Sequence, residues 1–305
     1  YTGTTYRGDI TFSMAYPAEA AYDISPTDSG LSEINIGYLA GNRMLKWKLD
    51  NSDGYYSSVE GHIYINMNGT ETTQLYSRTE MSISEAAALQ PNYLGSETNK
   101  DGETLIDPYN SEIKKIAQQV KSETGSDDTW TIARALFIWL KNNTVYYIDP
   151  ETSDYSSLPA ETLHNGKGKC DELSHLYISM LRANGIPARF VQGYLVYGNT
   201  KRYISHRWVE FYDGEWVPVE VSGGNTNAST EANYNFAILG ADHVKIFVDD
   251  GTSASMAGIG SYTSSYYDWP SAVSPFDEYY DAISYDPMYL AACADGTREL
   301  MEEME

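Results

Sequence analysis

Hydrophobic periodicity changes twice along this chain, and the changes limit the folds open to it. Within the first 85 residues, apolar and polar side chains alternate in stretches such as Leu31–Leu39 and Val59–Met67, which predicts half-buried strands. From residue 111 the apolar spacing becomes helical, and strand-like patterns return between Ala188 and Val248. Strands, then helices, then strands predict an α+β protein rather than an all-helical or all-strand fold.

Three regions follow from this pattern. Residues 1–90 are expected to form an N-terminal β-rich domain, residues 91–250 a core of helices and antiparallel strands, and residues 251–305 an acidic C-terminal segment rich in Tyr and Ser. The stretch Ser84–Lys100 contains Pro91 and several Gly and Asn residues, so it is interpreted as an irregular linker.

The charge balance narrows the choice of partner. The chain has 43 acidic and 20 basic residues, for a net charge of −23, whereas binding to nucleic acid or to an anionic membrane surface needs basic patches. Apolar runs of about 18 residues, which a membrane-spanning helix requires, are absent from the sequence. We expect a protein or peptide substrate, with cell-wall peptide as one candidate, and neither nucleic-acid binding nor membrane insertion.

Location is indicated only weakly. The sequence begins at Tyr1 rather than Met, so the chain is expected to be trimmed or processed, and any targeting segment would already be gone. Three Asn-x-Ser/Thr sequences match the N-glycosylation acceptor pattern. Both observations favour an extracellular or cell-surface protein.

The chain contains two cysteines, Cys170 and Cys293. Two are too few for a disulfide scaffold or a cysteine-rich zinc site. Either the two form one bridge, or one of them is chemically active and the other is incidental. We expect no cofactor and no metal ligands.

Cys170 stands at the start of a predicted amphipathic helix that extends to about Asn184. The amide groups and dipole of a helix N-terminus stabilise an anion, and the thiolate is the reactive form of cysteine. Cys170 is therefore a candidate nucleophile. The competing interpretation is a small apolar residue that closes the helix onto the core. The apolar face of the helix comprises Leu173, Leu176, Tyr177, Met180 and Leu181.

A thiolate nucleophile needs an imidazole base, and the imidazole needs an orienting acid. His206 begins one predicted strand and Glu220 lies in the next. If Tyr212, Asp213 and Gly214 form a three-residue hairpin loop with Gly214 at positive φ, His206 lies directly opposite Glu220 on the same face. A two-residue loop would place the two side chains on opposite faces.

The other histidines are weaker candidates for the base. His164 precedes Cys170 by six residues and remains a second candidate. His175 follows Cys170 by five residues, about 140° around the helix, so it is expected to point away. His62 and His243 lie in alternating strands and are interpreted as structural.

Four segments together resemble the core of the transglutaminase-like (papain-related) cysteine protease superfamily. Two surround the candidate nucleophile, one is similar to the family's histidine strand, and one to the strand of its third catalytic residue. The resemblance covers residues 110–248 and does not extend to residues 1–90 or 251–305. The segments are GKGKCDELSHL (166–176), LRANGIPAR (181–189), HRWVE (206–210) and WVPVE (216–220).

This resemblance implies a nucleophile helix packed on an antiparallel sheet that carries the histidine and the acid. It implies acyl transfer through a thioester, with Cys170 as nucleophile, His206 as base and Glu220 as orienting acid. The family usually has Asp at the third position, so Glu220 departs from its pattern. Asp171 and Glu210 are the other available carboxylates, with poorer placement.

The expected function is that of a cysteine peptidase or amidase that cleaves peptide, isopeptide or other amide bonds. One alternative is a protein-crosslinking transglutaminase that uses the same three residues. The other is a non-catalytic peptide- or glycan-binding module that keeps the fold.

Overall fold

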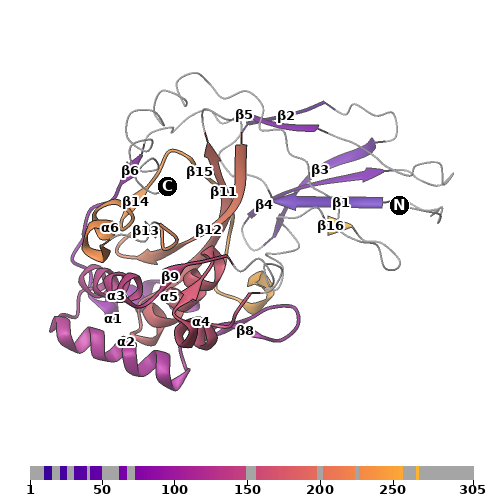
Figure 1. Ribbon diagram of the computed structural model, residues 1–305. Coiled ribbons are helices and arrows are strands. Elements are labelled where there is room, and N and C mark those ends of the chain that lie inside the picture. The colour runs from indigo at the N-terminus through magenta and orange to yellow at the C-terminus, as the bar shows by residue number, and fades with distance from the viewer. Residues whose placement is uncertain are drawn as a thin grey trace.

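A computed structural model gives the arrangement of the chain (Figure 1). It describes residues 73–148, 156–197, 202–223 and 227–256, together with several shorter strands. Within this described part, no helix is long and apolar enough to cross a membrane. The shorter strands are residues 10–15, 21–25, 31–39, 42–49, 62–66 and 266–267.

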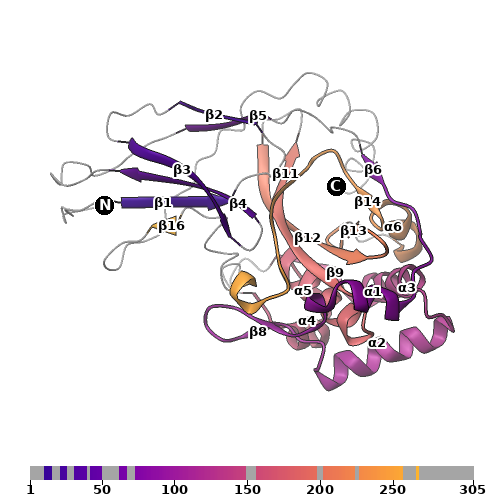
Figure 2. The same cartoon turned by 180° about the vertical axis from the view of Figure 1, so that it is seen from behind.

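A four-stranded antiparallel sheet forms the centre of the core, in the order β13-β12-β11-β15. Figures 1 and 2 show helices gathered along one side of this sheet and the N-terminal strands beyond its other side. The α+β fold with a nucleophile helix packed on an antiparallel sheet is therefore confirmed. The strands are β11 (Ala188–Tyr197), β12 (Arg202–Tyr212), β13 (Trp216–Val219) and β15 (His243–Val248).

Helix α5 (Cys170–Ala183) is the central helix of the core, and its predicted extent is confirmed. The helix ends just before Gly185, which has a positive φ of 80°. Glycine adopts this conformation without steric cost. Burial extends around most of the helix, which is typical of a helix enclosed by other elements. The predicted apolar face, Leu173, Leu176, Tyr177, Met180 and Leu181, is at most 1% exposed.

Two capped helices pack beside α5. Helix α2 (Ser111–Thr124) is capped by Asn110, whose side chain accepts hydrogen bonds from the backbone amides of Glu112 and Ile113. Helix α3 (Thr129–Asn143) begins at Asp128, whose carboxylate accepts from the Thr131 amide at 2.8 Å. Because both helices contribute fully buried apolar residues to one cluster with α5, the three share a single core.

The linker predicted over Ser84–Lys100 is wrong. Helix α1 (Ile83–Leu89) occupies its first part, with Ser82 and Glu85 forming a capping box. Ile83 is buried in the core, and its amide donates to the Asp127 carbonyl at 3.0 Å. Packing against the core therefore orders a segment whose composition is typical of a loop. The 3-10 helix η1 (Pro91–Leu94) and the short pair β7 (Glu97–Thr98) and β8 (Thr104–Ile106) follow.

The segment before α1 is also joined to the core. Strand β6 (Gln74–Leu75) pairs with β14 (Ile238–Leu239), and the Thr79 amide donates to Asp213 at 2.7 Å. The boundaries at residues 90 and 250 stay predictions. The remaining short elements of the core are β9 (Val145–Tyr146), α4 (Pro159–Asn165), β10 (Lys167–Gly168) and α6 (Ala228–Tyr234).

The N-terminal strands form a four-stranded antiparallel sheet, β16-β1-β4-β3, and a separate pair, β2-β5. The strand predicted over Leu31–Leu39 is confirmed, and so is the part of the strand predicted over Val59–Met67 that the structure describes, His62–Asn66. The rest of that prediction lies outside the described residues. Asn42 exchanges two side-chain hydrogen bonds with the backbone of Val248, which joins β4 to β15. The bounds are β1 (Ile10–Ala15), β2 (Ala21–Ser25), β3 (Leu31–Leu39), β4 (Asn42–Leu49), β5 (His62–Asn66) and β16 (Tyr266–Tyr267).

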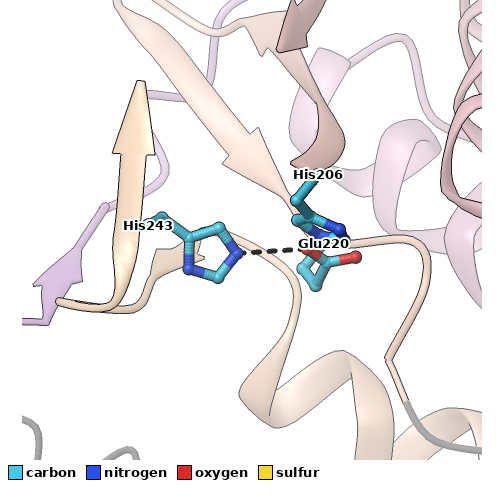
Figure 3. Close-up of side chains that lie close together, drawn as sticks. All are labelled: His206, Glu220 and His243. Atoms are coloured by element: carbon cyan, nitrogen blue, oxygen red, sulfur yellow. Dashed lines mark hydrogen bonds and ion pairs between the residues drawn. The ribbon is translucent and has the colours of Figure 1, made fainter. Parts of the chain in front are cut away.

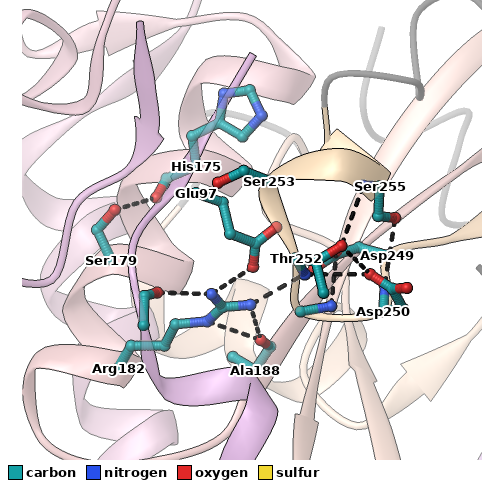
Figure 4. Close-up of polar contacts among 12 residues, drawn as sticks. Glu97, His175, Ser179, Arg182, Ala188, Asp249, Asp250, Thr252, Ser253 and Ser255 are labelled. Carbon is teal, nitrogen blue, oxygen red and sulfur yellow. Dashed lines mark hydrogen bonds and ion pairs between the residues drawn. The ribbon is translucent and has the colours of Figure 1, made fainter. Parts of the chain in front are cut away.

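A buried guanidinium fastens the end of α5 to its surroundings (Figure 4). Arg182 donates to Glu97 at 2.5 Å, to the Ala188 carbonyl at 2.7 and 2.9 Å, and to Asp249 at 3.4 Å. All three charged side chains are fully buried. Burial raises the pKa of Glu97 to about 8 although the attraction of Arg182 opposes the shift. One cation therefore faces two carboxylates, and Glu97 retains its proton in the folded state at neutral pH.

Glu97 should make stability fall as pH rises from about 4.5 to 8, because the folded protein keeps a proton that the unfolded chain releases near 4.5. The slope from this group is at most about 1.4 kcal/mol per pH unit. Glu97→Gln removes this titration. Urea unfolding gives the free energy of unfolding of both proteins at pH 5 and pH 8. The value for wild type minus the value for Glu97→Gln should be smaller at pH 8 than at pH 5. An equal difference at both pH values would contradict the assignment.

Candidate active site

Cys170 is the first residue of α5, is buried with 8% of the residue exposed, and carries a free thiol. The chain reaches it through Gly168 in β10, which pairs with β9. A side chain at Gly168 would lie 3.0 Å from Glu172 and 3.1 Å from Thr162, so glycine permits this close approach to the helix. The predicted helix N-terminal position of the thiol is confirmed. Cys293 lies outside the described residues.

Two carboxylates of the first helical turn fix the backbone around the thiol. Glu172 accepts from the amides of Ser157 and Lys169 at 2.7 and 2.9 Å. Asp171 accepts from the Ser156 hydroxyl and lies 3.9 Å from the Lys169 ammonium. These contacts hold the segment that precedes the helix against its N-terminus.

His206, on β12, contacts both partners that the sequence predicts for it. Its Nε2 donates to Glu220 Oε2 at 2.5 Å (Figure 3), and the Cys170 side chain lies near enough to influence the ring electrostatically. Because Nε2 faces Glu220, Nδ1 is the nitrogen left for the thiol. Burial lowers the pKa of His206, but Glu220 and Cys170 outweigh it and raise the pKa to about 10. This environment favours a charged imidazolium at neutral pH.

The predicted pairing of His206 with Glu220 is correct in face and wrong in register. Val209 lies opposite Val219 and Tyr212 opposite Trp216, which leaves Asp213, Gly214 and Glu215 as the hairpin loop. Gly214 has the expected positive φ, 81°. Extending this register places Trp208, not His206, opposite Glu220, so His206 and Glu220 are diagonal neighbours. Diagonal positions are about 7–8 Å apart, a span that favours Glu over the shorter Asp.

The carboxylate of Glu220 is fixed from several sides. Its Oε1 accepts from the Ser222 amide at 2.6 Å. The loop that follows is held by Lys141, whose ammonium donates to the carbonyls of Val221 and Gly223 and pairs with buried Glu231 at 3.1 Å. Burial raises the pKa of Glu220, but the neighbouring imidazoles outweigh it and hold the pKa well below its usual range.

His243 also contacts Glu220, a contact that its interpretation as a structural residue does not anticipate. Its Nε2 donates to the same Glu220 oxygen at 3.1 Å (Figure 3). Its Nδ1 donates to Asp242 Oδ1 at 2.8 Å. Strand alternation gave no sign of this contact. It depends on β15 lying beside β11 with an irregular register between Gln192 and Gly193.

The other candidate bases lie elsewhere. His164 is an exposed residue of α4. His175 is buried in the core, where its ring stacks on Phe190 with a centroid separation of 4.8 Å. Burial lowers the pKa of His175 to about 4 although Asp171 opposes the shift. It is therefore neutral at physiological pH.

The other candidate acids have different partners. Asp171 contacts Ser156 and Lys169, as described above, and Glu210 forms ion pairs with Arg189 at 2.6 Å and with Lys245. Glu220 is therefore the carboxylate that the described structure brings to His206.

His206, Glu220 and His243 also have donor types that bind metal ions, with ligand atoms within 4.8 Å of one another. Ligands on a tetrahedral zinc ion lie about 3.3 Å apart. His206 Nε2 and Glu220 Oε2 are closer, at 2.5 Å, so the contact would have to open to admit a metal ion. The described distances therefore fit hydrogen bonds between these side chains better than their coordination of a metal ion.

Glu220→Asp should slow the reaction of Cys170 with iodoacetamide at pH 6 roughly 10-fold, because the shorter chain loses a charge-assisted contact with His206. Peptide mass spectrometry would give the rate, and exposed Glu215→Asp is the matched control. An unchanged rate for Glu220→Asp would show that the diagonal register does not require the longer side chain.

Comparisons with known proteins bear on the family of this chain. The sequence model of the Transglutaminase-like superfamily matches residues 114–221. The uncharacterized protein ML0607 of Mycobacterium leprae (strain TN) is 29% identical over 120 residues, 37% of this chain and 41% of that protein. This chain thus matches less than half the length of that relative.

Two solved structures are distantly similar to this chain. One is a proposed cysteine protease from Cytophaga hutchinsonii, with a TM-score of 0.45, 17% identity and coverage of 92% of this chain and 91% of that chain. The other is red sea bream transglutaminase, with a TM-score of 0.35, 10% identity and coverage of 73% and 46%. These likenesses are too distant to indicate an activity. The match over residues 114–221 confirms the resemblance predicted from the motifs.

Proposed function

We propose that the transglutaminase-like core of this chain is that of a cysteine hydrolase, which cleaves peptide, isopeptide or other amide bonds. The observation that supports the proposal most strongly is the grouping of three side chains: the free thiol of Cys170, the His206 imidazole whose pKa it helps to raise, and Glu220, which accepts a hydrogen bond from His206 at 2.5 Å. The three residues come from a helix N-terminus, a strand and the end of the next strand. A nucleophile, a base and an orienting group in this order are the requirements of covalent acyl transfer.

In the first half-reaction, the Cys170 thiolate attacks the carbonyl carbon of the scissile amide. The backbone N–H of Cys170, at the helix N-terminus, is a suitable donor to the developing oxyanion. The His206 imidazolium then gives its Nδ1 proton to the departing amine. The carbon–nitrogen bond breaks, and a thioester joins the substrate acyl group to Cys170.

In the second half-reaction, neutral His206 takes a proton from water, and the water oxygen attacks the thioester. The carbon–sulfur bond breaks, the carboxylic acid leaves, and the thiolate–imidazolium pair is restored. Glu220 remains ionised throughout, because its environment depresses its pKa. Its role is to hold the ring with Nδ1 directed at the thiol.

We also propose an extracellular or cell-surface location and a peptide substrate, with cell-wall peptide as a candidate. The net charge of −23 supports a cationic rather than an anionic substrate.

His206→Ala should slow alkylation of Cys170 by roughly 100-fold at pH 6, because an unassisted thiol ionises near pH 8.5. The wild type should react at similar rates at pH 6 and pH 8. Cys293→Ser, present in all variants, removes the second thiol from the assay. Equal rates for wild type and His206→Ala at pH 6 would contradict the proposal.

Amide hydrolysis should be detectable with a peptide library that includes isopeptide-linked and cell-wall peptides, and Cys170→Ser should abolish it. Mass spectrometry of the products, with and without an added primary amine, separates water from amine as the acceptor. Amine incorporation in excess of hydrolysis would support the crosslinking alternative. An unreactive Cys170 with retained peptide binding would support the non-catalytic module instead.

A further inference from the structure

We propose that His243 is a positioning residue of this site, which clamps the Glu220 carboxylate against His206 while Asp242 holds His243 in turn. The inference rests on the proposed function, because it concerns how the same three residues are held. It extends the series Cys170–His206–Glu220 by two further side chains from outside the resembling motif strands.

The contacts form one continuous chain. Glu220 Oε2 accepts from His206 at 2.5 Å and from His243 at 3.1 Å, and His243 donates on its other side to Asp242 at 2.8 Å. The side chains of Glu220, His243 and Asp242 are 12%, 9% and 5% exposed. Solvent is therefore largely kept from these hydrogen bonds, which makes each of them stronger than in water.

The hydrogen bonds of the His243 ring indicate that the ring is positively charged. Its Nδ1 faces the Asp242 carboxylate and its Nε2 faces the Glu220 carboxylate. Ionised carboxylates only accept hydrogen bonds, so both ring nitrogens must carry a proton. His243 is then a cation between two anions. The His206 and Trp208 rings also face it, at centroid separations of 5.6 and 5.3 Å.

The electrostatic surroundings of His243 also favour its charged form. Burial lowers the pKa of His243, but the nearby Asp242 and Glu220 carboxylates raise it to about 9. The cation in turn stabilises ionised Glu220. A proton shared between His206 and Glu220 therefore stays on His206, where the proposed mechanism needs it.

The backbone brings His243 to this place through a glycine. Gly193 of β11 lies opposite His206, and a Cβ at Gly193 would lie 1.9 Å from the Val244 carbonyl oxygen. Only a residue without a side chain permits β15 to approach so closely here. The register between β11 and β15 shifts at this point, and His243 pairs with Leu195.

The clamp gives a reason for the departure from Asp at position 220. The Glu220 carboxylate accepts from three donors, the two imidazole rings at Oε2 and the Ser222 amide at Oε1. A side chain long enough to reach His206 diagonally has more rotational freedom than Asp, and ordering it costs more entropy. The additional donors restrict that freedom.

A double-mutant cycle tests whether His243 acts through Glu220. The readout is the alkylation rate of Cys170 at pH 6, in a Cys293→Ser background, for His243→Leu, Glu220→Ala and the double variant. His243→Leu should slow alkylation roughly 10-fold with Glu220 present. It should have no further effect when Glu220 is already alanine.

Rescue by a conservative variant separates positioning from packing. His243→Gln keeps an N–H donor where Nε2 lies, so it should retain a rate within about threefold of wild type. His164→Gln, on the exposed face of α4, is the matched control and should not change the rate. Urea unfolding of each variant verifies that it is folded.

The protonation of His243 supplies a readout that does not depend on any rate. In ¹⁵N NMR spectra, both ring nitrogens of His243 should remain protonated from pH 6 to pH 8. Asp242→Asn should lower the pH at which His243 loses a proton. A neutral His243 at pH 7 in the wild-type protein would overturn the proposal.

The remaining outcomes are also distinct. A wild-type rate for His243→Leu, or an equal loss with and without Glu220, would overturn the positioning role while leaving the proposed function intact. If His206→Ala, measured in the same series, also alkylates at the wild-type rate, the proposed function fails as well.

Discussion

The short hydrogen bond between His206 and Glu220, 2.5 Å long, is the contact on which the rest of the site depends. It determines which ring nitrogen faces the thiol, and it places a negative charge beside an imidazole that burial alone would leave neutral. Without that charge, the desolvation of His206 would disfavour the imidazolium, and a thiolate at Cys170 would lose its counterion. In the proposed mechanism, the site therefore works as an ion pair held in position rather than as three separate side chains.

Much of the surrounding fold serves to keep this contact in place. Lys141, at the end of α3, holds the carbonyls that follow Glu220, and Arg182, at the far end of α5, ties the nucleophile helix to the strand carrying Ala188. Both cations are buried, and each is paired with a buried carboxylate: Lys141 with Glu231 and Arg182 with Asp249. Removing one member of such a pair costs about 3–5 kcal/mol. The contacts of these two cations thus connect helices α3 and α5, strand β11 and the loop after Glu220 around the site.

The sequence predicts the main parts of this arrangement, because amphipathic spacing identifies the α5 helix and a glycine turn identifies the hairpin. The alternation of side chains along the two strands correctly predicts that His206 and Glu220 lie on one face of the sheet. The predicted hairpin loop starts at Tyr212, whereas the observed loop starts at Asp213, so the predicted register is wrong. Helix α1 was missed although Ser82 and Glu85 have capping-box spacing. His243 was missed for a deeper reason, since its position depends on the close approach of β15 at Gly193, and strand alternation does not encode such an approach.

The central claim is that Cys170 and His206 form a thiolate–imidazolium pair in the resting protein. Ultraviolet absorbance of the thiolate measures this directly, as the difference between the Cys293→Ser protein and the same protein with Cys170→Ser, titrated from pH 4 to pH 9. The account predicts that the thiolate signal is already present at pH 6. A signal that emerges only above pH 8, as for an ordinary thiol, would contradict it.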